Sequence, residues 1–177
     1  TLKETRRLSK LIKELMELAR ADNKKIKIEK QSTDINELTK KIVKPYVELA
    51  EIQNKKLKLE LEYNKKIQIN QNKINELFVI LLDNSLKYTN DGDTITIKTY
   101  AKDGKCNIEV QDTGIGISKE GIKHIFERFY REDKARSRQT GGNGLGLAIA
   151  QNIITLHKGT IKAEHNDPKG TVIKIKI

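Results

Sequence analysis

Apolar side chains recur along this chain with two different periods, and the two periods predict two kinds of element. In four stretches they return every three or four residues, which is the spacing of one face of a helix. These predicted helices cover residues 1–20, 34–49, 74–85 and 145–156. In the second of them, Asp34 has a side chain suited to the N-cap position, and Pro45 inside the pattern predicts a kink or a break.

Shorter stretches have apolar residues at every second position, which is typical of half-buried strands. They lie at residues 26–28, 57–61, 67–69, 95–97, 106–110, 160–165 and 171–177. The Asp103-Gly104 pair between two of them predicts a hairpin. Because helices and strands are mixed without a strict alternation, we expect an α+β fold in which helices cover one face of a sheet.

Length and composition place the chain among globular proteins. Its 177 residues suit one domain with a short additional arm, and an apolar share of 36% allows a buried core. The single cysteine excludes a disulfide framework and a cysteine-rich zinc site, so we expect Cys106 to be a small buried side chain. No apolar run approaches the roughly 20 residues of a membrane span and no signal-peptide pattern opens the chain, so we expect a soluble, intracellular segment.

The net charge of +11 raises the question of nucleic-acid binding. The charge is uneven, however: residues 1–30 hold ten basic and five acidic side chains, whereas residues 71–110 hold five and six. Only 5% of the residues are aromatic, tryptophan is absent, and no stacking motif interleaves with the lysines. We therefore expect lysine-rich solvated faces and no nucleic-acid partner.

The first of four groups of candidate functional residues lies at the end of the third predicted helix. Asn84, Lys87 and Tyr88 are three and four positions apart, which places them on one stripe beside the core face. An amide, an ammonium group and a phenol together could hold a metal-bound phosphate and an aromatic base. Polar residues that are simply solvated would produce the same pattern.

A second group directly follows a predicted strand and reads Asp112-Thr113-Gly114-Ile115-Gly116-Ile117. Its two glycines permit a tight turn or a positive φ angle, and Asp112 could accept a hydrogen bond from an amino group of a ligand. The motif is not a dinucleotide fingerprint, whose third glycine would fall at Lys119, and no Gly-Lys-Ser/Thr triplet of a phosphate loop follows. A plain turn is the alternative interpretation.

The third group is the aromatic and basic run Ile125-Phe126-Glu127-Arg128-Phe129-Tyr130-Arg131. Three of the eight phenylalanine and tyrosine residues of the chain fall in it. A surface helix with an apolar anchor would also explain this run. Residues 127–144 carry few aliphatic side chains and predict a long loop, which in a compact domain is usually functional.

The fourth group opens the last predicted helix and reads Gly141-Gly142-Asn143-Gly144-Leu145-Gly146-Leu147. Glycines at a helix N-terminus let backbone N–H groups point at an anion, and the helix dipole favours negative charge there. The pattern predicts a phosphate-binding loop, with an ordinary helix-start loop as the alternative.

In this order and spacing, the four groups resemble the N, G1, F and G2 boxes of sensor histidine kinases. The fold of that family's catalytic domain is shared with the gyrase, heat-shock-90 and mismatch-repair ATPases. The resemblance implies a two-layer α/β sandwich of the Bergerat type, in which a mixed sheet of about five strands packs on about three helices, with an N-terminal bundle helix. It also divides the chain into residues 1–21, similar to the C-terminal part of the family's dimerisation and phosphotransfer helix, and residues 22–177, the catalytic ATP-binding domain.

The resemblance implies ATP and Mg²⁺ as ligands. Asn84 would ligate Mg²⁺, Lys87 would contact phosphate, and Asp112 would accept a hydrogen bond from the adenine amino group. Residues 127–143 would form a mobile lid over the nucleotide. The nucleotide-binding set that the resemblance predicts is Asn84, Lys87, Tyr88, Asp112, Gly114, Gly116, Ile117, Phe129, Tyr130, Arg131, Gly142, Gly144, Leu145 and Gly146.

Two features depart from the family pattern. Members commonly carry a second asparagine one helical turn before the first, and related hydrolases often have a glutamate there; this chain has Ile80, which disfavours efficient ATP hydrolysis. The acceptor histidine normally opens a His-Glu-Leu-Arg-Thr-Pro-like stretch, which this chain lacks. The neighbours of His124, His157 and His165 do not match that stretch, so no catalytic residue is predicted within the chain.

The resemblance thus implies the ATP-binding catalytic part of a sensor histidine kinase, a cytoplasmic domain of a membrane-anchored bacterial protein. The γ-phosphoryl group of ATP would pass to a histidine on a dimerisation helix outside this chain, within a homodimer. From there it would pass to an aspartate of a response regulator. The alternative is an ATP-binding interaction module without transfer activity, which Ile80 favours.

Overall fold

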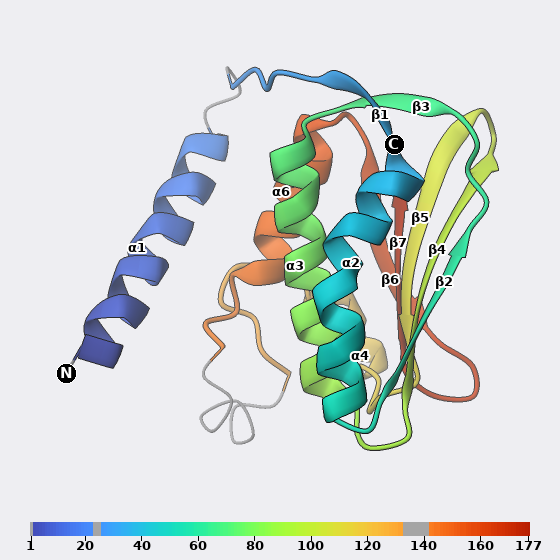
Figure 1. Cartoon of the computed structure of the whole chain (residues 1–177). Helices are drawn as coiled ribbons and strands as arrows, with labels where there is room; N and C mark the ends of the chain where they lie inside the picture. The colour runs from blue at the N-terminus through green and yellow to red at the C-terminus, as the bar shows by residue number, and fades with distance from the viewer. Residues whose placement is uncertain (1, 23–25, 133–141) are drawn as a thin grey trace.

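The computed structural model describes residues 2–22, 26–132 and 142–177 of the chain (Figure 1). The helices are α1 (Leu2–Asp22), α2 (Ile35–Ile52), α3 (Gln71–Tyr88), α4 (Lys119–His124) and α6 (Gly146–Leu156). The strands are β1 (Gln31–Asp34), β2 (Lys56–Leu61), β3 (Lys66–Ile69), β4 (Thr94–Lys102), β5 (Lys105–Asp112), β6 (Thr160–His165) and β7 (Thr171–Lys176). The sequence pattern does not predict α4, because its six residues are too few to show a helical period.

Five strands form one mixed sheet in the order β2-β4-β5-β7-β6. β2 and β4 run parallel, and the other neighbours run antiparallel. β4 and β5 form the predicted hairpin, in which Asp103 and Gly104 both have positive φ angles, 54° and 70°, as a type I′ turn requires. Helices α2, α3 and α6 cover one face of the sheet (Figure 1), which confirms the predicted two-layer α+β architecture.

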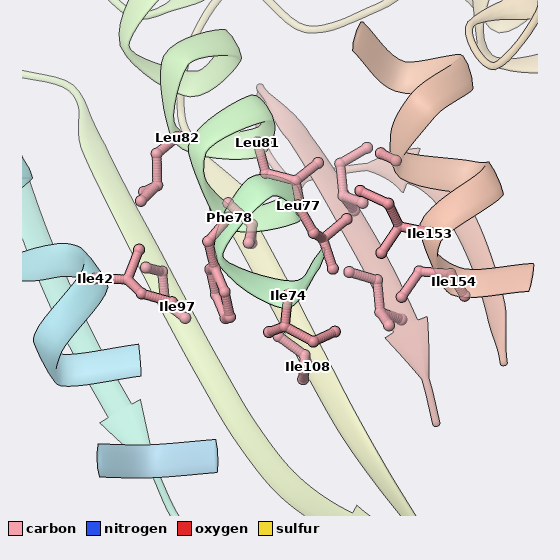
Figure 2. Packing of buried hydrophobic residues seen from close by; sticks show 14 of the residues in the cluster. Ile42, Ile74, Leu77, Phe78, Leu81, Leu82, Ile97, Ile108, Ile153 and Ile154 are labelled. Carbon is pink, nitrogen blue, oxygen red and sulfur yellow. The ribbon is translucent and has the colours of Figure 1, made fainter. Parts of the chain in front are cut away.

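The hydrophobic core fills the space between this sheet and the helices. α3 is the central helix, and it contributes a stripe of buried side chains formed by Ile74, Leu77, Phe78, Leu81 and Leu82 (Figure 2). They belong to one cluster with side chains of the sheet and of α6, which include Ile97, Ile108, Ile153 and Ile154. Because α3 is packed along its length, the polar residues at its C-terminal end have defined positions.

α2 begins as the sequence predicts but continues past its proline. Asp34 Oδ1 accepts hydrogen bonds from the N–H groups of Asn36 and Glu37, at 2.9 and 3.1 Å, which is an N-cap. The predicted break at Pro45 is wrong, because α2 runs through it without interruption. Pro45 faces solvent while α2 buries apolar side chains on both sides of it, so core packing holds the helix together where one backbone hydrogen bond is missing.

The N-terminal strand lies later than the apolar alternation indicates. Residues 26–30 form no strand, and β1 begins at Gln31. β1 pairs with β3 from Gln31 opposite Ile69 to Asp34 opposite Lys66, so all four residues of β3 already have partners. Alternation of apolar and polar residues predicts which residues could lie on one face of a strand, but it does not show whether a neighbouring strand is there to pair with them.

α1 lies beside α6, at the edge of the helical layer (Figure 1). Leu18 is buried, Leu11 packs against the core, and Arg128 Nη2 donates a hydrogen bond to Leu18 O at 3.4 Å. Another side of the helix exposes the apolar residues Leu8, Ile12 and Leu15. In the part of the chain that the structure describes, no helix combines the length and apolar character that crossing a membrane requires.

Candidate functional site

Three segments that are distant in sequence meet at the C-terminal end of α3. The Ile115 N–H group, in the loop after β5, donates a hydrogen bond to Tyr88 O at 3.0 Å. A Cβ atom placed on Gly142, in the loop before α6, would lie 2.7 Å from Lys87 Nζ. The structure therefore brings together the first, second and fourth groups of residues that the sequence singled out.

The last turns of α3 present two polar side chains and one aromatic ring. Asn84 is half-buried, and its side-chain amide forms no hydrogen bond with any described residue. Lys87 Nζ lies 5.1 Å from the centre of the Tyr88 ring, and Tyr88 itself is exposed. An available amide oxygen and an ammonium group on one helix face are suited to a metal-bound phosphate.

Asp112 ends β5 with only 8% of its surface exposed. Its Oδ1 atom accepts hydrogen bonds from the N–H groups of Gly114 and Thr171, at 3.0 and 3.2 Å, whereas Oδ2 has no partner among the described residues. Burial raises the pKa of this carboxyl group, and the charge of Asp93 raises it further, while the two backbone hydrogen bonds lower it. The site thus offers one oriented carboxylate oxygen to a hydrogen-bond donor.

The loop after Asp112 needs glycine for steric reasons. A Cβ atom on Gly114 would lie 2.2 Å from Tyr88 O, so only glycine lets the loop approach the end of α3 this closely. Gly170, which the sequence did not single out, is as tightly placed, because its Cβ would lie 1.9 Å from Asp112 O. Asn166 Nδ2 donates to the same Asp112 oxygen at 2.8 Å.

Thr171, Gly170 and Asn166 are therefore supporting residues that sequence reasoning missed. The available signal was a glycine immediately before the last strand, but nothing in the local pattern ties that glycine to Asp112. Gly116 and Ile117 lie further along the loop after β5, where they line a shallow cavity of about 290 Å³ together with residues 165–170. Asn84, Lys87 and Asp112 do not line this cavity.

The aromatic run is tied to the glycine-rich loop through the backbone. The Phe129 N–H group donates to Gly144 O at 2.9 Å, and a Cβ atom on Gly144 would lie 2.8 Å from the Phe129 carbonyl carbon. Phe129 is 55% exposed, and the connection runs through its backbone. Tyr130 is half-buried, with its ring centre 5.6 Å from that of His124, and Arg131 follows it in the chain.

The described part of the glycine-rich loop leads into α6. Leu145 is fully buried, and its N–H group donates to Asn143 Oδ1 at 3.2 Å. Gly146 opens α6, and a Cβ atom there would lie 3.3 Å from Ile80 Cγ2 of α3. The structure describes only part of the predicted lid over residues 127–143, because residues 133–141 lie outside the described residues.

Comparisons with known proteins agree with this fold and this grouping. The family model described as "Histidine kinase-, DNA gyrase B-, and HSP90-like ATPase" matches residues 69–177, so the chain belongs to this family of ATPases. Within the family, its catalytic domain is of the sensor histidine kinase type.

A curated relative resembles nearly the whole chain. The signal transduction histidine-protein kinase ArlS of Staphylococcus aureus is 39% identical over 175 residues. That alignment covers 99% of this chain but 39% of ArlS, so the chain spans about two-fifths of the length of the curated relatives it matches.

Solved histidine kinase structures share the fold. Full-length ShkA in complex with AMPPNP aligns with a TM-score of 0.82 at 20% identity, over 96% of this chain and 35% of that chain. ThkA in complex with the response regulator protein TrrA aligns with a TM-score of 0.76 at 23% identity, over 98% of this chain and 48% of that chain. At sequence identities of 20% and 23%, this structural similarity shows that the fold is shared.

Proposed function

We propose that this chain binds ATP with Mg²⁺ and supports transfer of the γ-phosphoryl group to a histidine on a dimerisation helix outside the chain. An imidazole nitrogen of that histidine forms a bond to the γ-phosphorus while the bond to the bridging oxygen breaks, and ADP leaves. The phosphoryl group then passes to an aspartate of a response regulator. In such reactions the catalytic domain contributes positioning and charge neutralisation.

One observation carries this proposal: the Lys87 ammonium group lies against the backbone of Gly142. This contact places a cation next to a glycine-rich loop that opens a helix, which together suit the phosphates of a nucleotide. Asn84 lies one helical turn before Lys87 with an available amide oxygen, so it fits the role of the Mg²⁺ ligand. Bound Mg²⁺ would offset the charge of the triphosphate and needs only one or two protein oxygens.

The base would bind at the opposite end of the site. Oδ2 of Asp112 would accept a hydrogen bond from the adenine amino group, which guanine replaces with a carbonyl acceptor. The tight loop at Gly114 and Gly116 would let the backbone approach the base. The remaining proposed nucleotide-binding residues surround these positions and are Tyr88, Ile117, Phe129, Tyr130, Arg131, Gly142, Gly144, Leu145 and Gly146.

The surroundings of two histidines support an acceptor outside this chain. Both ring nitrogens of His157 are engaged, because Nδ1 lies 2.7 Å from Ile153 O and Nε2 accepts from Asn70 N–H at 3.1 Å. His124 is held between Glu127 and Glu120, at 2.7 and 3.2 Å.

We also propose that residues 1–21 are the C-terminal part of the dimerisation helix and that residues 22–177 are the catalytic domain. The exposed apolar side of α1 supports this division, because a helix bundle would cover it in a homodimer. A response regulator is the proposed partner of the complete protein, and ThkA has been crystallised with one. The proposed location is the cytoplasmic side of a membrane-anchored bacterial kinase.

An ATP-binding interaction module without transfer is the second candidate, and Ile80 favours it. Its aliphatic side chain faces Gly146, at a position where members of the family commonly have a second asparagine. An isoleucine can neither ligate Mg²⁺ nor hydrogen-bond a phosphate.

The deciding experiment incubates the chain with γ-labelled ATP and Mg²⁺, with and without a separate dimerisation domain that carries the acceptor histidine. Acid-labile label on that domain, in its presence only, is the expected result. Binding of ATP without transfer would favour the interaction module. Label on the chain itself, at any of its three histidines, would contradict an acceptor outside it. Asn84→Ala should remove most of the Mg²⁺ dependence of binding, whereas Ile80→Asn should strengthen it.

A further inference from the structure

Lys55, in the connection between α2 and β2, is an unusual cation. Among the lysines and arginines whose burial the structure describes, it alone is buried, with 9% of its surface exposed. Burial lowers the pKa of its ammonium group, while the charges of Asp91 and Asp93 act in the opposite direction. Lys55 forms no ion pair with a described carboxylate, so its burial needs another explanation.

The partners of Lys55 are neutral oxygen atoms. Its Nζ atom donates to Leu86 O at 2.5 Å and to Gln53 Oε1 at 2.9 Å. Leu86 belongs to the last turn of α3, where carbonyl groups lack partners within the helix and carry partial negative charge. A buried cation at this place donates a hydrogen bond to a carbonyl group that has no partner within the helix. It also interacts favourably with the negative end of the helix dipole.

The last turn of α3 is fixed by donors from three different places. The Thr89 hydroxyl group donates to Ser85 O at 2.7 Å, Lys55 to Leu86 O, and the Ile115 N–H group to Tyr88 O at 3.0 Å. Of these donors, Lys55 belongs to the connection between α2 and β2, which contributes no residue to the proposed nucleotide site. Lys55 therefore ties the end of α3 to the sheet side of the molecule from outside the nucleotide site.

We propose that Lys55 is a positioning residue of the nucleotide site, which holds the last turn of α3 so that Asn84 and Lys87 face the Gly142 loop. The inference rests on the proposed function, because it assigns Asn84 and Lys87 to the metal and phosphates. It goes beyond that function by naming a residue that touches no part of the nucleotide.

Loss of the Lys55 ammonium group should weaken binding of the phosphates more than binding of the adenosine part of the nucleotide. Methionine at position 55 keeps a similar side-chain length but donates no hydrogen bond. Leu86 O then loses its 2.5 Å donor and keeps the longer contact from the Thr89 hydroxyl group at 3.4 Å, so the last turn of α3 is held less firmly. Asn84 and Lys87 depend on that turn, whereas Asp112 is held on β5 by Gly114 and Thr171. Binding of the triphosphate should therefore weaken more than binding of adenosine.

The experiment measures affinity of the 177-residue chain for Mg-AMPPNP and for adenosine by calorimetry, at a temperature where every variant is folded. Lys55→Met should weaken Mg-AMPPNP binding about five- to tenfold and adenosine binding less than twofold. Two controls are matched to it. Lys56→Met removes an exposed neighbouring charge, and Ile42→Val lowers stability through the core of α2, and both should leave the ratio of the two affinities unchanged.

Each outcome decides one question. An unchanged ratio in Lys55→Met, or an equal loss for both ligands, would show a purely structural lysine and overturn the inference. If Lys55→Met does not fold, Lys55→Arg keeps the charge but places a larger head group against Leu86 O. The same shift in the ratio is then expected, and its absence overturns the inference. Absence of Mg-AMPPNP binding by the wild-type chain would instead overturn the proposed function, and this inference with it.

Discussion

Asp112 combines burial with an acceptor atom, Oδ2, that has no partner among the described residues, and this combination sets its proposed specificity. In Asp112→Asn, the single amide oxygen would be retained by the Gly114 and Thr171 N–H groups, so the NH₂ group would face the adenine amino group. Two donors facing each other in a poorly hydrated place cost about 1–3 kcal/mol. We expect at least a tenfold loss of ATP affinity in Asp112→Asn, and at least a tenfold preference of the wild type for ATP over GTP.

The protonation state of Asp112 gives the same prediction a pH dependence. Because burial raises the pKa of this carboxyl group, ATP affinity should fall as the pH is lowered towards that raised value, and it should recover at neutral pH. Calorimetric titrations of ATP and GTP at several pH values measure both effects. Equal affinities for the two nucleotides would contradict adenine recognition by Asp112.

Single residues also show where sequence reasoning reaches its limit. The loop after Asp112 stands out because two glycines follow a strand, and the structure explains Gly114 by its contact with Tyr88 O. Gly170 has an equally close contact with Asp112 O, but the two residues are far apart in the chain. Such a contact depends on strand order, which local periodicity does not contain. Lys55 was missed for the same reason, because its role depends on a carbonyl group of another helix.

At the scale of elements, the spacing of apolar residues correctly predicted whether a long, regularly patterned segment forms a helix or a strand. α3 and the β4–β5 hairpin follow from apolar spacing and from turn residues. The break at Pro45 was wrong, because burial elsewhere in α2 outweighs one missing hydrogen bond. The strand expected at residues 26–28 was wrong as well, because β3 ends at Ile69, opposite Gln31, so no residue of β3 lies opposite the residues before Gln31.

His157 joins two elements, and its contacts predict a pH-dependent stability. Its neutral Nε2 atom accepts from the N–H group of Asn70, the N-cap of α3, while its Nδ1–H group donates to Ile153 O in α6. Burial lowers the pKa of His157 in the folded state, so the unfolded chain binds the proton more readily. The contribution of His157 is therefore fully present above its unfolded pKa, near 6.5, and is lost as the pH falls below it.

Urea unfolding of the wild type and of His157→Gln at pH 8 and at pH 5.5 measures this contribution. Carboxyl groups and His124 titrate in both proteins, so the difference between them isolates His157. The wild type should be more stable at pH 8, and its advantage should shrink at pH 5.5. An advantage that grows on acidification would show that the protonated ring is favoured in the folded state.

At the scale of the whole molecule, α1 contacts the proposed phosphate loop. Asn143 Nδ2 donates a hydrogen bond to Glu14, which places a carboxylate next to the loop that leads into α6. Negative charge there opposes a bound triphosphate. Glu14→Gln keeps an acceptor for Asn143 but removes the charge, so Mg-AMPPNP should bind about two- to fivefold more tightly at low ionic strength.

Glu17 supplies a matched control for the charge of Glu14. It also lies on α1, but it pairs with Lys73 of α3 at 3.6 Å, away from the glycine-rich loop. Glu17→Gln should change nucleotide affinity little, and the gain in Glu14→Gln should disappear at high salt. Equal gains in both variants would mean that only the net charge of α1 matters.

The division at residue 21 can be tested by removing α1. Among the residues of α1 whose burial the structure describes, Leu18 alone is buried in the core between α2, α3, α6 and the sheet. A cavity of about 210 Å³ lies beside it, lined in part by Phe126 and Ala148. Residues 22–177 should therefore fold alone, with a stability lower by about 1.5–3 kcal/mol for the lost burial of one leucine. Their affinity for Mg-AMPPNP should equal or exceed that of the full chain, because the Glu14 carboxylate is absent. Urea unfolding and calorimetry measure both quantities. A fragment without a cooperative unfolding transition would show that α1 is part of the catalytic domain.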